Sequence, residues 1–414
     1  MIKIIDKKDC CGCGACVQKC PKQCISFQED NEGFLYPIVN ETICIDCKLC
    51  EKVCPIINKL KPQELPKTLI ALKHIDEKIR KTSSSGGAFT AIASKIIKNG
   101  GVVFGAQFNH NWKVIHSYTE TIAGLDAFRG SKYVQSEIGN SYKEVELFLK
   151  SDRIVLFTGT PCQVSGLYNF LQKKYDNLYT LDFVCHGVPS PGVFRWYLQE
   201  ELNRSANLNN KNTIPIPPIR SIPKEEIKLP KGIKIQNIYF RDKINGWKKY
   251  NFSLHLTKSL ENGEKESLIF SNNTLKNPYL YGFISDIYLR PSCFKCPTKS
   301  LTSSSDFTIG DFWGQEFYFP EFDNDTGVSA VIPNTPKAKD FINGLDNVLL
   351  LQKPFNIFLK YNPSIAQSAT ITTAKKIIQK KFWHNIGKYP FAKNLKRSTH
   401  LSILERIFIK INNK

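Results

Sequence analysis

Residues 10–21, CCGCGACVQKCP, and residues 44–55, CIDCKLCEKVCP, carry the same pattern, C-x2-C-x2-C-x3-C followed by proline. In such a run three thiolates hold one iron–sulfur cube, and the fourth cysteine ligates the cluster of the other run. The spacing therefore predicts two 4Fe-4S clusters in a small N-terminal domain of the bacterial ferredoxin type, residues 1–60. The predicted ligands are Cys10, Cys13, Cys16 and Cys54 for the first cluster and Cys44, Cys47, Cys50 and Cys20 for the second.

A zinc ribbon and a disulfide scaffold are the alternatives to this interpretation. A structural zinc site usually takes two separated cysteine pairs rather than two identical four-cysteine runs. The chain opens without a signal-peptide pattern, and its longest uncharged stretch, 154–172, contains Gly159 and Pro161, which argue against a spanning helix. We therefore expect a cytoplasmic protein with reduced thiols and no transmembrane segment. Cys11 and Cys24 fall outside the pattern and are interpreted as thiols that ligate no iron.

The composition indicates a basic globular chain. Of its 414 residues, 57 are Lys or Arg and 37 are Asp or Glu, which gives a formal net charge of +20, and 42% are apolar. That apolar fraction supports a packed core and excludes global disorder. From residue 373 onward there are eleven Lys or Arg and one acid, Glu405. A positive surface suits acidic partners, and because this tail lacks a recognisable binding motif we expect no nucleic acid.

After a proline-containing linker, residues 56–67, the hydrophobic pattern alternates between strands and helices. Predicted strands span 68–73, 101–108, 153–157 and 179–184, and predicted helices span 87–98 and 162–174, with another ending over 145–150. This predicts an α/β fold (α+β overall) in which a larger α/β domain, 68–360, follows the ferredoxin-like domain. We also expect a flexible insertion at 203–232, a hairpin at 238–256 around Asn245-Gly246, and a basic C-terminal extension at 361–414.

Four further cysteines lie in the larger domain. Cys162 and Cys185 each follow a predicted strand, at the sheet edge where parallel strands collect ligands. Cys293 and Cys296 form a C-x2-C pair in a proline-flanked loop. From the residues alone, a third iron–sulfur cluster, a structural zinc and unliganded buried thiols all remain open.

Two polar loops are candidate anion sites. Ser83–Thr90, SSSGGAFT, precedes an apolar helix, so its glycines and the helix N-terminus could receive a phosphate. Residues 129–136, RGSKYVQS, place one lysine among hydroxyls. Neither is a Walker loop or a G-x-G-x-x-G fingerprint, and each pattern also fits an ordinary polar loop.

The order of motifs resembles the family of coenzyme F(420) hydrogenase/dehydrogenase beta subunits, here with an N-terminal bacterial-type 2[4Fe-4S] ferredoxin domain. The resemblance runs from Cys10 to about Pro333. It rests on SSSGGAFTAIA (83–93), GGVVFGAQF (100–108), RGSKYVQS (129–136), LFTGTPCQVSGL (156–167), DFVCHGVPSP (182–191), YFRDKINGW (239–247), LRPSCFKCP (289–297) and SDFTIGDFWG (305–314).

This resemblance implies an α/β domain that binds FAD, with an iron–sulfur cluster beside the flavin. The implied ligands of this third cluster are Cys162, Cys185, Cys293 and Cys296. The implied contacts of the FAD phosphates and ribityl chain are Ser85, Gly86, Gly87 and Thr90. The implied contacts of the flavin edge are Lys132, Thr158, Gly159 and Thr160.

The function implied is that of an iron–sulfur flavoprotein oxidoreductase, which passes electrons between ferredoxin-type clusters and FAD to reduce or oxidise a small organic substrate. Coenzyme F(420) is one candidate substrate. The alternative is a non-catalytic electron-transfer subunit of a larger redox complex. His186 is a candidate proton donor, although a lone histidine is more often a hydrogen-bonding spectator. The expected partner is an acidic electron carrier such as ferredoxin, or a hydrogenase/dehydrogenase-type subunit.

Overall fold

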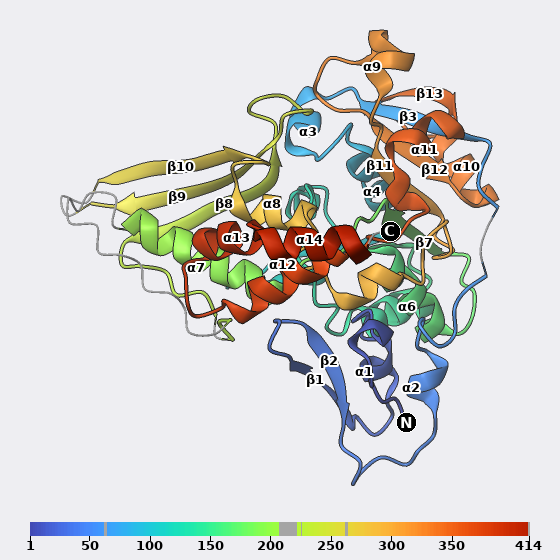
Figure 1. Ribbon diagram of the computed structural model, residues 1–414. Helices are drawn as coiled ribbons and strands as arrows, with labels where there is room; N and C mark the ends of the chain where they lie inside the picture. Colours follow the sequence, from blue (N-terminus) through green and yellow to red (C-terminus); the bar gives the residue numbers. More distant parts are fainter. Residues whose placement is uncertain (62–63, 207–221, 225, 261–263, 413–414) are drawn as a thin grey trace.

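The computed structural model describes residues 1–61, 64–206, 222–224, 226–260 and 264–412 (Figure 1). The N-terminal domain is a two-stranded antiparallel hairpin with two short helices, and it lies at one end of the molecule. Its elements are η1 (Lys7–Asp9), α1 (Ala15–Lys19), β1 (Ile25–Glu29), β2 (Leu35–Val39) and α2 (Leu49–Lys52). This confirms the small iron–sulfur domain that the two cysteine runs predict.

The second part is built on an eight-stranded mixed sheet in the order β13-β3-β12-β11-β7-β6-β4-β5. The four strands β4, β6, β7 and β11 run parallel, and the remaining pairings are antiparallel. The strands are β3 (Thr68–His74), β4 (Val102–Phe108), β5 (Val114–Thr119), β6 (Val155–Thr158), β7 (Leu178–Phe183), β11 (Phe307–Asp311), β12 (Ser329–Pro333) and β13 (Val348–Pro354). The α/β expectation is therefore confirmed.

Helices cover both faces of this sheet, as the alternation of strands and helices predicts. On one face α4 (Ala88–Lys98) and α10 (Pro336–Asn343) pack with η2 (Ala123–Ala127), and α5 (Ser141–Lys150) and α6 (Pro161–Leu171) pack on the other. Shorter elements complete the layers. They are α3 (Glu77–Thr82), α9 (Gln315–Tyr318), η4 (Pro320–Phe322), α11 (Phe355–Tyr361) and η5 (Pro363–Ile365).

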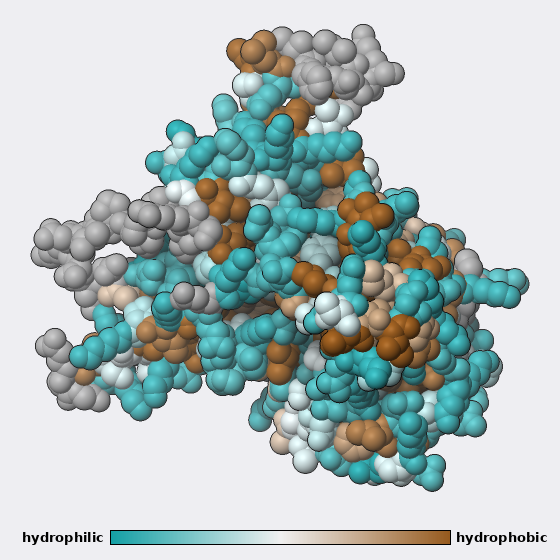
Figure 2. Space-filling view, turned by 90° about the horizontal axis from the view of Figure 1, so that it is seen from below, coloured by the Kyte–Doolittle hydropathy of each residue, from teal (hydrophilic) through white to brown (hydrophobic). Residues whose placement is uncertain are grey.

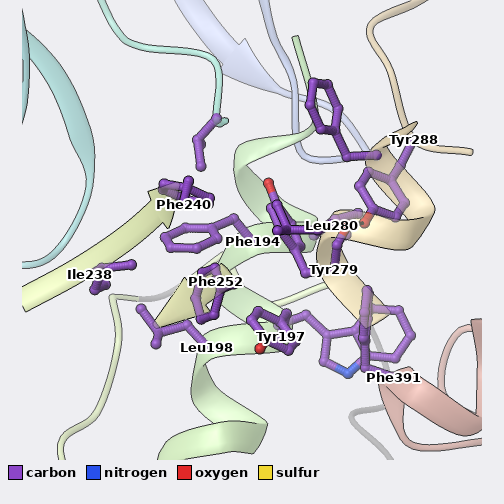
Figure 3. Packing of buried hydrophobic residues seen from close by; sticks show 14 of the residues in the cluster. Phe194, Tyr197, Leu198, Ile238, Phe240, Phe252, Tyr279, Leu280, Tyr288 and Phe391 are labelled. Carbon is purple, nitrogen blue, oxygen red and sulfur yellow. Dashed lines mark hydrogen bonds between the residues drawn. The ribbon is translucent and has the colours of Figure 1, made fainter. Parts of the chain in front are cut away.

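A second lobe holds a three-stranded antiparallel sheet in the order β10-β9-β8, where the sequence predicts one hairpin. Its elements are α7 (Pro191–Ala206), β8 (Ile233–Asp242), β9 (Asn251–Ser259), β10 (Lys265–Asn273), α8 (Pro278–Ile284), η3 (Pro291–Lys295), α12 (Thr373–His384), α13 (Phe391–Thr399) and α14 (Ile403–Asn412). An aromatic core joins the strands to α7, α8 and α13 (Figure 3). Phe382 and Phe391, from the basic segment after residue 360, are buried in that core, so this segment packs as part of the lobe.

Most of the predicted insertion at 203–232 lies outside the described residues, namely 207–221 and 225. In its described part, Ile222 is buried in the core of the second lobe. Arg195 on α7 donates from Nε to the carbonyl of Pro223 at 2.8 Å. The last turns of α7 occupy residues 203–206. The described ends of the segment therefore contact α7.

Candidate functional site

The ferredoxin-type cysteines gather around two small cavities. Cys10, Cys13, Cys16 and Cys54 line one, and Cys20, Cys44, Cys47 and Cys50 line the other. The two other thiols of this domain each line one of these cavities. Cys11 lines the first, and Cys24 lines the second, where the Sγ atoms of Cys24 and Cys20 are 3.3 Å apart. The helix α1 supplies Cys16, and α2 supplies Cys50.

The four cysteines of the larger domain also meet at one cavity. Cys162 lies in the first turn of α6 after β6, and Cys185 follows the adjacent parallel strand β7. Because parallel neighbours end at the same sheet edge, these two thiols come together there. Cys293 on η3 and Cys296 complete the lining.

This edge is shaped by the start of α6. The hydroxyl of Thr160 accepts from the backbone N–H of Gln163, whose side chain accepts from the N–H of Thr160, so a capping box fixes the first turn. Pro161 occupies the first helical position, where its missing N–H is not needed. Cys162 Sγ then lies 3.2 Å from Thr160 Oγ1.

These thiols suit a group that keeps them ionised. Burial raises the pKa of Cys185, and contact with the Cys11 thiol together with burial raises that of Cys162, so neither ionises readily alone. Bound iron would deprotonate them outright. Among the described residues, no three His, Cys, Asp or Glu side chains converge on the position of a single metal ion. Cys162, Cys185, Cys293 and Cys296 line one cavity, and four thiolates are ligands that both a 4Fe-4S cluster and a zinc ion accept.

The first ferredoxin-type cavity and the third cysteine site lie against each other. Cys11 lines both, and its thiol contacts Cys13 on one side and Cys162 on the other. The close approach is made by α6: a Cβ added to Gly166 would lie 3.1 Å from Cys13 Sγ. Cys162 is four residues before Gly166 on that helix, a rise of about 6 Å.

The buried side chain of Arg290 connects the first ferredoxin-type site to the large domain. Arg290 is fully buried, and donates from Nε to the Cys10 carbonyl at 2.7 Å and from Nη2 to Cys10 Sγ at 3.4 Å. Its Nη1 donates to Gln135 Oε1 at 2.9 Å, and Gln135 in turn donates to the Cys11 carbonyl at 3.0 Å. Gly12, with φ of +72°, leaves room for both, because a Cβ there would lie 2.7 Å from Gln135 Nε2.

A larger cavity of about 440 Å³ opens between the main sheet and the second lobe. Its charged and aromatic lining has more cations than acids. The cations are Lys81, Arg129, Lys132 and Arg241, the acids are Asp126 and Asp242, and the rings are those of Phe108, Trp112, Tyr239, Phe240 and His255. Burial lowers the pKa of Lys132 to about 7, and its Nζ reaches only the carbonyls of Arg129 and Gly130, both at 3.3 Å. In the described chain, Nε and Nη2 of Arg241 and Nε2 of His255 are buried without a hydrogen-bond partner.

The two predicted polar loops meet at the wall of this cavity. Ser84 Oγ lies 2.8 Å from Ser131 Oγ and accepts from the Ser131 N–H at 2.6 Å. Of the eight residues that the resemblance assigns to FAD, Lys132 lines the cavity. Thr90 does not line the cavity but contacts a residue that does, since its Oγ1 accepts from Nε of Arg129 at 3.1 Å.

The other predicted FAD residues bond within the protein. Ser85 Oγ donates to the Val328 carbonyl at 2.7 Å, and the Gly86 N–H donates to Ser329 Oγ at 2.9 Å. Gly87 precedes α4 as its N-cap. On the side of the third cysteine site, Thr158 Oγ1 donates to the Phe104 carbonyl at 2.8 Å, while the Gly159 N–H donates to the Leu181 carbonyl at 3.1 Å and Thr160 caps α6. None of these six lines the 440 Å³ cavity.

His186 lies at the third cysteine site, beside Cys185. Its Nε2 is 2.6 Å from Oδ1 of the buried Asp286, whose Oδ2 also contacts Lys375 of α12. Gln379, one turn further along α12, donates to the Asp286 carbonyl at 2.8 Å. The basic C-terminal segment therefore reaches the residue that orients His186.

Sequence reasoning missed Arg290, Gln135 and Arg241, although each lies inside a quoted motif. The sequence did mark the two arginines, because in LRPSC and YFRD an arginine interrupts an otherwise apolar or cysteine-bearing stretch. The residues that each arginine contacts are distant in sequence, so only the fold shows what the arginine does. In the described part of the chain, no helix is both long and apolar enough to cross a membrane.

Comparison with known proteins matches both parts. Residues 9–56 match a family model described as a 4Fe-4S dicluster domain, and residues 152–354 match one described as the C terminus of the coenzyme F420 hydrogenase/dehydrogenase beta subunit. A coenzyme F420-dependent sulfite reductase of Methanocaldococcus jannaschii is 25% identical over 191 residues, 45% of this chain and 29% of the relative. The F subunit of the F(420)H(2) dehydrogenase of Methanosarcina mazei is 26% identical over 172 residues, 39% of this chain and 48% of the relative.

The chain thus spans less than half the length of these two curated relatives. A chain of the xenon-derivatised F420-reducing [NiFe] hydrogenase complex from Methanosarcina barkeri aligns with a TM-score of 0.41 and 16% identity, over 82% of this chain and 92% of that one. The cysteine sites and both matched domains lead to one conclusion. Residues 152–354 form a C-terminal domain of the coenzyme F420 hydrogenase/dehydrogenase beta-subunit type, and residues 9–56 form a 4Fe-4S dicluster domain in front of it.

Proposed function

We propose that this chain is an iron–sulfur flavoprotein oxidoreductase with three 4Fe-4S clusters and one FAD. The ferredoxin-type ligands are those of the two lined cavities, and Cys162, Cys185, Cys293 and Cys296 hold the third cluster. The observation that carries the proposal is the cavity these four cysteines share with Cys11 of the ferredoxin domain. A cluster held by these four cysteines would lie directly against the dicluster domain, which supports the proposal. A cytoplasmic location stays part of this proposal.

We assign FAD to the 440 Å³ cavity, whose volume is within the usual range of ligand pockets, about 300–1,000 Å³. Nη1 of Arg241 is paired with Asp311, while its buried Nε and Nη2 have no partner among the described residues. Because buried donors without partners are costly, these two atoms support an anionic ligand such as a diphosphate. Lys132 adds a second donor, and Phe108 and Trp112 offer aromatic faces to ring systems. Ser85, Gly86, Gly87 and Thr90 support this wall from behind, and Thr158, Gly159 and Thr160 shape the side toward the third cluster.

Aromatic side chains fill the space between the cavity and the third cysteine site. Phe240 lines the cavity and lies 5.8 Å, centroid to centroid, from Tyr133, which lies 4.7 Å from Phe283. Phe283 then lies 5.5 Å from the ring of His186, next to Cys185. Bound FAD would exchange a hydride with a substrate and single electrons with 4Fe-4S centres.

The second ferredoxin-type site is the proposed contact for an external redox partner. Cys47 is exposed there, whereas Cys13, Cys16 and Cys54 of the first site are buried. Figure 2 views the molecule from the side on which the ferredoxin domain lies, and shows separate apolar patches among hydrophilic residues. Ile45, two residues before Cys47, is 58% exposed. An acidic carrier such as ferredoxin, or a hydrogenase/dehydrogenase-type subunit, would suit the basic chain.

The proposed substrate is a small organic hydride carrier or acceptor, with coenzyme F(420) the leading candidate because both relatives carry that name. His186, the proton donor that the sequence predicts, lines the third cysteine site and not the 440 Å³ cavity, and its Nε2 is held by Asp286. Its proton would therefore serve only a substrate bound at the third cysteine site. A non-catalytic electron-transfer subunit is the second candidate, favoured because the M. mazei relative is itself one subunit of a dehydrogenase.

The test is the iron, zinc and flavin content of anaerobically purified full-length protein. The proposal predicts about twelve irons and one FAD per chain, with no stoichiometric zinc. About eight irons without flavin would restrict the redox chemistry to the dicluster domain and favour the electron-transfer subunit. Zinc at one per chain with about eight irons would replace the third cluster by a structural zinc site.

A further inference from the structure

Among the described residues, no acid balances the buried charge of Arg290 beside the first ferredoxin-type site. Its side chain is fully buried, with its guanidinium carbon 4.4 Å from the centroid of the Tyr36 ring. In the described chain it forms no ion pair with a carboxylate; its acceptors are the carbonyls of Cys10 and Leu35, the amide of Gln135 and the sulfur of Cys10. A buried charge without a counter-charge is strongly unfavourable. The site is therefore built to face a negative group at Cys10.

The second ferredoxin-type site lacks such an arrangement. There the Met1 ammonium and the Lys48 ammonium both contact Asp46, at 2.8 and 2.9 Å, so their charges are balanced by an acid. The sulfur of Cys50 accepts a backbone N–H, from Ile2 at 3.3 Å. Within the described residues, no side-chain cation donates to a cysteine sulfur of this site.

The difference has a direct electrostatic consequence. A 4Fe-4S centre with four thiolates carries a charge of about −2 when oxidised and gains one more negative charge on reduction. A buried positive group with a hydrogen bond to a ligand sulfur stabilises the reduced form more than the oxidised form, which raises the reduction potential. The effect is large where solvent is excluded, and weak for charges already paired and exposed.

We propose that Arg290 sets the direction of electron flow within the ferredoxin domain, by raising the reduction potential of the cluster at Cys10, Cys13, Cys16 and Cys54 above that of the second cluster. The electron then resides preferentially on the cluster nearest Cys11 and Cys162. Arg290 acts here as a positioning residue with a fixed charge, through the Cys10 ligand. This inference rests on the proposed clusters, but not on the identity of the substrate.

The test is an EPR-monitored redox titration of the anaerobic full-length protein, comparing wild type with Arg290→Gln. We expect the ratio of reduced first to reduced second cluster to fall at least tenfold, which is 59 mV for a one-electron couple. Arg195→Gln is the matched control: Arg195 also joins the two domains, through Glu29, but contacts no cysteine. It should leave both potentials unchanged. Arg290→Lys keeps the charge and should retain most of the difference.

Two outcomes would overturn the inference. The first is an Arg290→Gln variant with full iron content and unchanged potentials. The second concerns Gln135→Glu, the variant to use if Arg290→Gln fails to assemble its clusters. This substitution places a carboxylate beside Nη1 of Arg290 and so offsets the guanidinium charge without removing it. That variant should also lower the first potential, and an unchanged value at full iron content would refute the role of Arg290. Absence of the two cluster signals in wild type would instead refute the proposed function.

Discussion

Two glycines make a close backbone contact between the ferredoxin domain and the large domain. Gly33, in the turn between β1 and β2, has φ of +81°, and a Cβ there would lie 2.6 Å from Gly192 Cα at the start of α7. Beside it, Ser190 Oγ donates to the Glu32 carbonyl. Gly33→Ala must therefore either displace α7 or lift the hairpin, because the added Cβ would meet the backbone Cα and N of Gly192.

The size of the effect can be separated into two terms. A non-glycine residue in the left-handed region costs about 1–2 kcal/mol, and overpacking of a close contact costs about 1–3 kcal/mol. Gly33→Ala should therefore destabilise the protein by about 2–5 kcal/mol. Gly100→Ala is the matched control, since Gly100 has φ of +75° but no atom within 4 Å of an added Cβ. It carries the backbone term alone, about 1–2 kcal/mol.

Two assays test this reasoning. The urea midpoint of Gly33→Ala should lie clearly below that of Gly100→Ala, with iron content equal in both. The rate at which reduced clusters deliver electrons to bound flavin should fall in Gly33→Ala and stay at the wild-type value in Gly100→Ala, because Cys11 would move away from Cys162. Indistinguishable midpoints and rates in the two variants would refute the claim that this contact holds the domains in register.

The third cysteine site, the cavity lysine and the Asp286 pair each give a further prediction. Cys162→Ala should lose about four irons per chain while Cys24→Ala keeps all of them, and unchanged iron in the first variant would remove the third-cluster assignment. Lys132, with a pKa of about 7 in the free protein, must take up a proton to face an anion above that pH. FAD affinity should then decline by up to about tenfold per pH unit above 7 in wild type, whereas Lys132→Met should show weaker binding and a flat profile in calorimetric titration. The pKa of buried Asp286 is lowered despite burial, because His186 and Lys375 bond its carboxylate. The ionised carboxylate therefore stabilises the folded protein above the unfolded-state pKa of about 3.9, and this stabilisation is lost as the pH falls through the folded-state pKa. Lys375→Met should thus have a lower urea midpoint than wild type at neutral pH, and the two curves should converge on acidification; a constant gap would contradict the pairing.

The parts of the fold that follow local patterns were predictable from sequence. Apolar runs such as Val155–Thr158, buried at all four positions, indicate central parallel strands, and turn residues mark where they end. The β8–β9 hairpin followed from Asn245-Gly246, and Gly246 N–H donates to the Lys243 carbonyl in that turn at 2.9 Å. Family motifs then gave the candidate third cysteine site, although the ligands come from three separate segments.

Features that depend on tertiary contacts were not predictable in this way. The wall of the 440 Å³ cavity combines residues 81–84, 126–132 and 237–242, and only the folded chain brings them together. The glycine-rich loop at 83–90 is a predicted phosphate site. In the structure, Ser85 Oγ donates to the carbonyl of Val328, just before β12, and the Gly86 N–H donates to Ser329 Oγ, the first residue of β12. The sequence predicts a basic extension at 361–414, and only the folded chain shows which core receives its Phe382 and Phe391, which are buried in the second lobe.

The central claim is that electrons pass between the ferredoxin-type clusters and a flavin within this one chain. The most direct measurement is anaerobic stopped-flow absorbance after mixing full-length protein with a one-electron donor. The account predicts that the iron–sulfur absorbance bleaches first, and that bound flavin is then reduced in the same protein without added mediator. Bleached clusters beside a flavin that stays oxidised, or a protein that retains no flavin, would contradict it.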